Sequence, residues 1–304
     1  MNNNKSCLIA FLLIISQALI GQENLSSDLN KAIDTIPFEL TDQNNISISA
    51  ILNKQDTVQL MFHTATNSLS LTTNIIPKLS SLHWNNSEEV ESWGGKSDAR
   101  FSEKNALQIN QLFWENLPIW ETINSGPGTN GKFGPNLFEG KAIEIDFDNS
   151  VMVIHKHIPK KIKTYEKLKL AFENGFMFLE GNSKIAGENY PNKFLIHSGF
   201  GGTILYDDKF VADSKIGEHI VITETQELKD SYGNIIHTKK GILPKFTLGT
   251  AVFHDLPVGF FEGSIGRQKM SVLGGNLLKR FNLIIDAERS NIYLKSNQLS
   301  SLAY

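Results

Sequence analysis

Cysteine is almost absent from this sequence. The single cysteine, Cys7, lies in the N-terminal segment, so the rest of the 304-residue chain can form no disulfide within itself. Too little apolar sequence precedes Cys7 for a lipoprotein attachment site. The fold must therefore be held by a buried core, which a chain of this length can supply.

Charge of one sign is also scarce. The 29 Lys and Arg residues nearly balance the 32 Asp and Glu residues, giving a formal net charge of −3. Because the basic residues are spread along the chain, we expect no nucleic-acid partner. The one basic run, HKHIPKKIKTYEKLK at 155–169, contains a proline and joins two patterned apolar regions, so we interpret its centre, 159–165, as an exposed linker.

Long hydrophobic runs are limited to one. The first residues, MNNNKSCLIAFLLIISQALIGQ, place one lysine before an apolar run of roughly fifteen residues, as in a secretory signal peptide. A membrane-spanning helix needs roughly twenty apolar residues. The sequence therefore predicts a signal peptide over 1–21, a linker over 22–36, and a secreted or periplasmic protein with no membrane span after cleavage. We expect no cofactor.

Two stretches of the chain repeat each other. Residues 51–65 (ILNKQDTVQLMFHTA) align with 185–199 (IAGENYPNKFLIHSG), and 134–154 align with 274–294. Shorter matches lie between these blocks in the same order, at 92–95 with 231–234 and at 107–119 with 246–258. Ordered self-similarity of this kind predicts two copies of one unit, over 37–158 and 166–304.

The local patterns predict a mainly β fold with a few short helices. Alternating apolar residues predict a hairpin at the end of each half and another over 46–62. Asp146 and Asp286 occupy matched positions before the two end hairpins, where we expect the same local hydrogen-bonding role. Short helices are expected within 71–82 and 206–216, the second capped by Asp207 and Asp208, and at the GPNLF and GGNLLKRF segments.

This arrangement resembles the retropepsin-like aspartic proteases of the pepsin and retropepsin superfamily. The segments that carry the resemblance are FLIHSGFGGTILYDDKF (194–210) and SVLGGNLLKRFNLIIDAERSNIYLK (271–295). The resemblance is to a two-lobed, secreted member of bacterial type. It implies two pseudo-symmetric β lobes with a peptide-binding cleft between them.

In that family, each lobe supplies an Asp-Thr-Gly or Asp-Ser-Gly loop to a catalytic aspartate pair. Here the matching loops read His63-Thr64-Ala65 and His197-Ser198-Gly199, so histidine stands at both aspartate positions. The resemblance implies that Thr64 and Ser198 hydrogen-bond across the lobes and orient the loops. It also implies a substrate-binding role for the residues after the hydroxyls and for two flap tips, which are Ala65, Gly199, Trp93, Gly94, Tyr232 and Gly233.

Histidine changes the chemistry that such a pair can perform. Two neighbouring carboxylates share a proton, whereas a facing imidazole pair is neutral or singly positive. One interpretation is a pseudoprotease that binds an extended peptide or unfolded protein segment without cleaving it. Alternatives are a peptide hydrolase that uses His63 and His197 as base and acid, a metal site with both as ligands, and a purely structural role. His155 and His157 also have ligand-like spacing, but we interpret them as the end of a strand.

Overall fold

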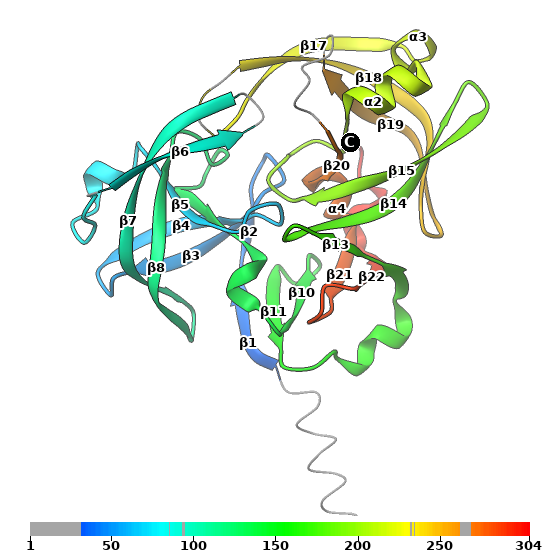
Figure 1. Cartoon of the computed structure of the whole chain (residues 1–304). Helices are drawn as coiled ribbons and strands as arrows, with labels where there is room; N and C mark the ends of the chain where they lie inside the picture. Colours follow the sequence, from blue (N-terminus) through cyan, green and yellow to red (C-terminus); the bar gives the residue numbers. More distant parts are fainter. Residues whose placement is uncertain (1–31, 85, 93–94, 232, 234, 262–268) are drawn as a thin grey trace, which may run out of the picture.

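The computed structural model describes residues 32–304 except 85, 93–94, 232, 234 and 262–268, and the predicted signal peptide lies outside these residues. The described chain is built mainly from strands in three sheets, two of which belong to the two halves (Figure 1). The predicted fold class is thus confirmed. No helix in the described part of the chain is long and apolar enough to cross a membrane.

The N-terminal half folds into an eight-stranded sheet of order β2-β3-β4-β9-β5-β8-β7-β6. The second part of strand β3 alternates, with Ile48, Ala50 and Leu52 buried and the residues between them exposed, as expected for a half-exposed strand. The elements are β2 (Glu39–Leu40), β3 (Ile46–Leu52), β4 (Asp56–Phe62), β5 (Leu69–Thr72), η1 (Ile76–Lys78), β6 (Asn86–Ser92), β7 (Gly95–Ile109), β8 (Leu112–Thr122), β9 (Gly131–Phe133) and η2 (Pro135–Phe138).

The C-terminal half forms a second eight-stranded sheet of order β13-β14-β15-β20-β16-β19-β18-β17. Its elements are β13 (Ala171–Glu173), β14 (Phe176–Ile185), β15 (Glu188–His197), β16 (Ile204–Tyr206), α2 (Asp208–Ser214), α3 (Ile216–His219), β17 (Ile222–Lys229), β18 (Ile235–Leu248), β19 (Ala251–Phe261), β20 (Ser271–Gly274) and α4 (Gly275–Leu278).

The two sheets have the same topology. In each, the strand before the histidine pairs in parallel with the strand before the late short helix, β4 with β9 and β15 with β20. In each, the strand after the histidine loop also pairs in parallel with a long hairpin strand, β5 with β8 and β16 with β19. The sequence repeat therefore corresponds to a repeated arrangement in space.

A third sheet of six strands joins the halves. Its order is β1-β11-β10-β21-β22-β12, and the central pair of strands places Ile143 opposite Ile285. The strands are β1 (Ala32–Pro37), β10 (Ala142–Asp146), β11 (Val151–His155), β12 (Glu166–Lys169), β21 (Phe281–Ile285) and β22 (Asn291–Ser296), with η3 (Lys160–Thr164) and η4 (Gln298–Ser301) nearby in the chain. Both predicted end hairpins are present, and they meet in this shared sheet.

Two local predictions need correction. Residues 32–36, assigned to a linker, belong to β1, because β11 offers an edge with which they pair. The helix expected within 71–82 is reduced to the three-residue η1, because Leu71 and Thr72 continue strand β5.

The expected roles of several aspartates agree with the structure. The Asp207 side chain caps α2 by accepting from Phe210 N at 2.8 Å. Asp146 accepts two hydrogen bonds from Asn149, and Asp286 accepts four from Ser290 and Asn291. The two matched aspartates thus hold the bends of the two end hairpins.

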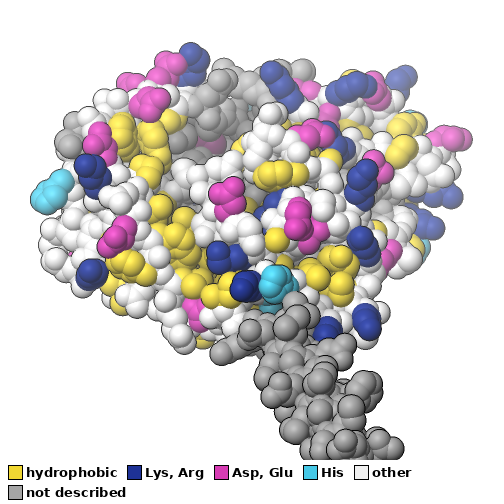
Figure 2. All heavy atoms as spheres, turned by 60° about the horizontal axis from the view of Figure 1, so that its bottom comes forward, with side chains coloured by type: hydrophobic (Ala, Val, Ile, Leu, Met, Phe, Trp, Pro, Cys, Tyr) yellow, Lys and Arg dark blue, Asp and Glu magenta, His cyan; other side chains and the backbone are white. Residues whose placement is uncertain are grey.

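Charges on the surface are mixed. On the face drawn in Figure 2, Lys and Arg side chains alternate with Asp and Glu side chains rather than forming a field of one sign. This face therefore carries no extended basic patch.

Candidate functional site

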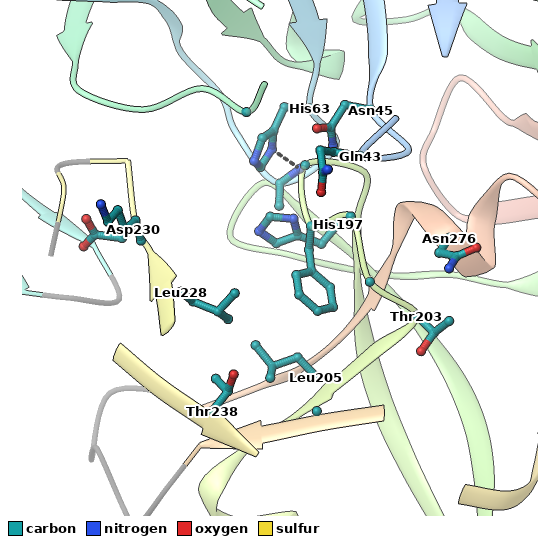
Figure 3. A pocket seen from close by; sticks show the side chains of 18 of the residues that line it. Gln43, Asn45, His63, His197, Thr203, Leu205, Leu228, Asp230, Thr238 and Asn276 are labelled. Carbon is teal, nitrogen blue, oxygen red and sulfur yellow. Dashed lines mark hydrogen bonds between the residues drawn. The ribbon is translucent and has the colours of Figure 1, made fainter. Parts of the chain in front are cut away.

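The two histidine loops meet between the halves. His63 directly follows β4 and His197 ends β15, and each loop is held by the parallel partner of its strand. Their side chains face one another at the floor of a cleft (Figure 3). The fold therefore brings together two residues that lie far apart in the sequence.

Thr64 and Ser198 link the loops through a reciprocal network. Thr64 Oγ1 donates to Ile196 O at 2.7 Å and accepts from Ser198 N at 3.0 Å. Ser198 Oγ donates to Phe62 O at 2.7 Å and accepts from Thr64 N at 3.0 Å. The expected hydrogen bonds across the lobes are present, and both side chains are buried.

The His63 and His197 rings are in direct contact. Their centroids lie 4.6 Å apart with an interplanar angle of 59°. His63 is only 7% exposed, and its Nδ1 accepts from Ala65 N at 3.1 Å. A Cβ added at Gly199 would lie under 3.0 Å from the His63 ring, so a glycine at this position makes room for the imidazole.

Burial keeps this pair neutral. Desolvation, with the neighbouring His197 and Lys132, holds the pKa of His63 well below its ordinary value of 6.5. Desolvation, with Lys132, also lowers the pKa of His197 to about 4. At neutral pH both rings are therefore uncharged, and each offers one donor and one acceptor.

Lys132 is a site residue that the sequence analysis missed. It lies on β9, where the matched strand β20 of the other half carries Val272, and it is 9% exposed. Burial lowers the pKa of Lys132 to about 8, while Asp230 opposes that shift. The available signal was the alignment of Lys132 with the apolar Val272 of the other half.

A hairpin of the C-terminal half reaches across to the N-terminal half. We call residues 228–231, at the end of β17 and the start of the following turn, the strap. The Ser231 carbonyl accepts from Ile123 N at 2.8 Å, Asn124 N at 3.0 Å and Thr122 Oγ1 at 2.6 Å. Lys132 also donates to Ser231 Oγ. The strap is thus fixed to the opposite half by four hydrogen bonds.

The His pair, Lys132 and the strap line one cleft of about 870 Å³. The wall from the C-terminal half is largely apolar and includes Phe200, Leu205 and Met270. The wall from the N-terminal half is more polar and includes Gln43 and Asn45. Figure 3 shows Leu228 and Asp230 of the strap across the cleft from this polar wall.

The predicted substrate-binding residues divide into three groups. Ala65 and Gly199 line the cleft beside the histidines. Trp93, Gly94 and Tyr232 lie outside the described residues. Gly233 lies close to Ile123 rather than in the lining.

The two predicted flaps are not equivalent. Residues 226–229 of β17 line the cleft, whereas the described part of β6 in the other half contributes nothing to its lining. The hairpin over the cleft therefore comes from the C-terminal half.

Metal-type side chains do not cluster in the described part of the chain. No group of three or more His, Cys, Asp or Glu residues there is placed to hold an ion. His155 contacts a carboxylate, since its Nε2 lies 2.8 Å from Glu144 Oε2, and Lys161 also pairs with Glu144. Glu144 is fully buried, so this group connects β10 to the segment after β11.

Comparison with known proteins identifies the fold. No protein-family model matches the sequence, and no curated protein does. The structure is similar to the crystal structure of an aspartic proteinase from Irpex lacteus, with a TM-score of 0.57 over 88% of this chain and 98% of that chain. The sequences are 11% identical, so the likeness concerns architecture. This chain has the two-lobed β fold of an aspartic proteinase.

Proposed function

We propose that the protein is a secreted pseudoprotease of the retropepsin-like type that binds an extended peptide in the cleft without cleaving it. The observation that supports this proposal is the pair of neutral imidazoles at the cleft floor, where the resemblance places an acid pair. The loop framework around the pair is intact.

Neutral imidazoles with lowered pKa values are poorly suited to activating water. Aspartic-protease chemistry uses one carboxylate as base and a neighbouring carboxylic acid as proton donor. General bases work best when their pKa lies near the working pH. A pKa of about 4 for His197, and one well below 6.5 for His63, make both rings weak bases at neutral pH.

Peptide binding does not depend on the acid pair. The cleft volume of about 870 Å³ falls within the range of ordinary ligand sites, roughly 300–1,000 Å³. Strand β17 forms the edge of its sheet and lines the cleft, and among the described strands it pairs with β18 alone. An extended peptide binds to such elements through main-chain hydrogen bonds and side-chain pockets.

The alternative function is peptide hydrolysis by the His pair. The observation that favours it is that both rings are in their basic form at neutral pH beside the cation Lys132. In this alternative, one ring takes a proton from water as the water oxygen bonds to the peptide carbonyl carbon. That proton then passes by way of the imidazole pair to the amine nitrogen as the C–N bond breaks.

One experiment separates the two functions. Wild-type protein and a His63→Ala, His197→Ala variant are incubated with a diverse peptide pool from pH 4 to 8, and both cleavage and retention are recorded by mass spectrometry. We expect both proteins to retain peptides and neither to cleave them. His254→Ala, at an exposed histidine, is the control variant. Cleavage by both wild type and His254→Ala, but not by the double variant, would establish the hydrolase.

Secretion is part of the proposal and rests on the N-terminal sequence. We expect the mature protein outside the cytoplasm to begin near residue 22. N-terminal sequencing of the protein from cell fractions tests this expectation, and an intact N-terminus in the cytoplasmic fraction would contradict it.

A further inference from the structure

The strap makes the kinds of contact that a bound peptide would make. Its Ser231 carbonyl accepts main-chain hydrogen bonds from Ile123 and Asn124, the two residues that follow β8, and a bound extended peptide also uses main-chain hydrogen bonds. Its Leu228 side chain packs against the buried apolar cluster of the C-terminal half that includes Leu195 and Leu205. One segment thus uses both the polar and the apolar wall.

The strap also satisfies the buried cation in the cleft. Lys132 is 9% exposed and Asp230 is 8% exposed, so both charges are largely removed from water. A buried ammonium group is costly unless a carboxylate or hydrogen-bond acceptor compensates it. Asp230 supplies the opposite charge, and Ser231 Oγ supplies the acceptor.

We propose that the strap is an internal stand-in for the ligand, and that the ligand is an extended peptide with the pattern apolar, any residue, acidic, hydroxyl. This pattern is that of residues 228–231 of the strap. The proposal rests on the proposed function, peptide binding in the cleft. When the strap lifts, the ligand places its acidic side chain at Lys132 and its apolar side chain against the cluster that Leu228 covers.

The proposal implies competition within one chain. A tethered segment acts at a high effective concentration, about millimolar for short flexible connections. The apparent association constant for a free peptide is the intrinsic one multiplied by the fraction of molecules in which the strap is open. Weakening the strap therefore strengthens binding without adding any contact to the ligand.

A release variant tests the competition. Asp230→Asn with Ser231→Ala removes the charge and the hydroxyl with which the strap compensates Lys132, and leaves Lys132 available to a ligand. The probe is the fluorescent peptide QELKDS, which copies residues 226–231, and binding is measured by anisotropy. We expect the variant to bind it at least tenfold more tightly than wild type does. Equal affinities would overturn the proposal.

Two matched changes test the ligand pattern. In the release variant, a probe with asparagine in place of its aspartate should bind about tenfold more weakly, and so should a probe with alanine in place of its leucine. Adding Lys132→Met should remove the effect of the aspartate and keep the effect of the leucine. A release variant that retains peptides from the pool without these preferences would overturn the inference and leave the proposed function intact.

A disulfide lock gives a readout that needs no ligand. Asn124→Cys with Ser231→Cys, in a Cys7→Ser background, joins two segments whose backbones already share a hydrogen bond. With an N-hydroxysuccinimide acetate reagent, Lys132 should acetylate at least tenfold faster in the reduced form than in the oxidised form, as read by peptide mass spectrometry.

The lock also separates the two possible failures. Equal acetylation in both redox forms would show that the strap does not open, and would overturn the inference even if peptides bind. Faster acetylation in the reduced form, with no peptide bound to the release variant, would show an opening strap and a wrong proposed function.

Discussion

At the scale of single residues, Gly199 has the tightest requirement in the site. The His63 ring occupies the space that a side chain at 199 would need, whereas the matched loop carries Ala65. We expect Gly199→Ala to lower the free energy of unfolding by about 1–3 kcal/mol, because the added methyl group overpacks a buried contact. Urea denaturation measures this change.

Gly217 provides the matched control. A Cβ there would meet the Phe260 ring at 3.4 Å, an ordinary contact, in the exposed part of α3. Gly217→Ala should therefore be neutral or slightly stabilising. Similar losses from both substitutions would contradict the account of the His63 contact.

The lowered pKa values of the histidines predict acid sensitivity. Between pH 6.5 and about 4, His63 and His197 bind protons in the unfolded chain but not in the folded protein. The contribution of these histidines to the unfolding free energy is therefore largest above pH 6.5 and falls as the pH decreases. The slope should reach about 1.4 kcal/mol per pH unit for each histidine. Unfolding free energies measured at pH 7, 6, 5 and 4.5 test this prediction.

Two variants identify the groups responsible for that slope. His63→Asn with His197→Asn should flatten the profile. Burial raises the pKa of Glu144, but hydrogen bonds from His155 and Lys161 lower it further, to below its ordinary 4.5. The stability that ionised Glu144 contributes is therefore lost only below pH 4.5. Glu144→Gln should leave the slope of unfolding free energy against pH unchanged between pH 4.5 and 6.5. A flat wild-type profile would contradict the neutral pair.

The sequence predicted single residues where the repeat supplied a reference. It identified His63, His197, Thr64 and Ser198, because their loops align with each other. It missed Lys132, because the surroundings of that side chain in the cleft depend on the distant Asp230 and Ser231. It also offered no carboxylate for His155, since Glu144 becomes its neighbour only when two strands pair.

At the scale of elements, Arg289 fixes the hairpin β21–β22 to the N-terminal half. Its guanidinium donates to the carbonyls of Lys141 and Phe138 at 2.9 Å each. Arg289→Met would leave these buried carbonyls without that donor, so we expect a loss of about 2–4 kcal/mol in unfolding free energy. The urea midpoint measures it.

Arg100 is the control for this prediction. It pairs with Glu121 at 2.6 Å, but its side chain is 53% exposed. Arg100→Met should cost less than about 1 kcal/mol, because an exposed ion pair is weak. Comparable losses for both arginines would contradict the role given to Arg289.

Elements were predicted well where the pattern was local. The hairpin over 46–62 follows from alternating residues, and the Asp207 cap follows from a preference of helix starts. Residues 32–36 could not be recognised as a strand, because their pairing partner β11 lies more than a hundred residues away. The sequence also could not predict that β17 lines the cleft whereas the described part of β6 does not, because this difference depends on contacts between the halves.

At the scale of the whole molecule, neither half is complete alone. The shared sheet pairs β10 with β21, and the Thr64 and Ser198 network crosses the same boundary. We expect residues 32–158, produced alone, to be insoluble or loosely packed, because a buried strand edge becomes exposed. Size-exclusion chromatography and near-ultraviolet circular dichroism test this expectation.

Cleavage after folding is the control. A protease site inserted into 159–165 and cut in the folded protein should leave the halves associated. Co-production of the two halves should also restore a compact complex. A folded, monomeric N-terminal half would contradict the dependence on the shared sheet.

The replacement of Val272 by Lys132 in the other copy has a consequence for the direction of a bound chain. A cleft between two identical halves would present the same walls to a peptide running either way. Here one half places an ammonium group in the cleft lining, whereas the matched Val272 of the other half is fully buried and lies outside the lining. The two orientations of a peptide backbone in such a cleft are therefore not equivalent, and Lys132 adds to the inequality that the strap already creates.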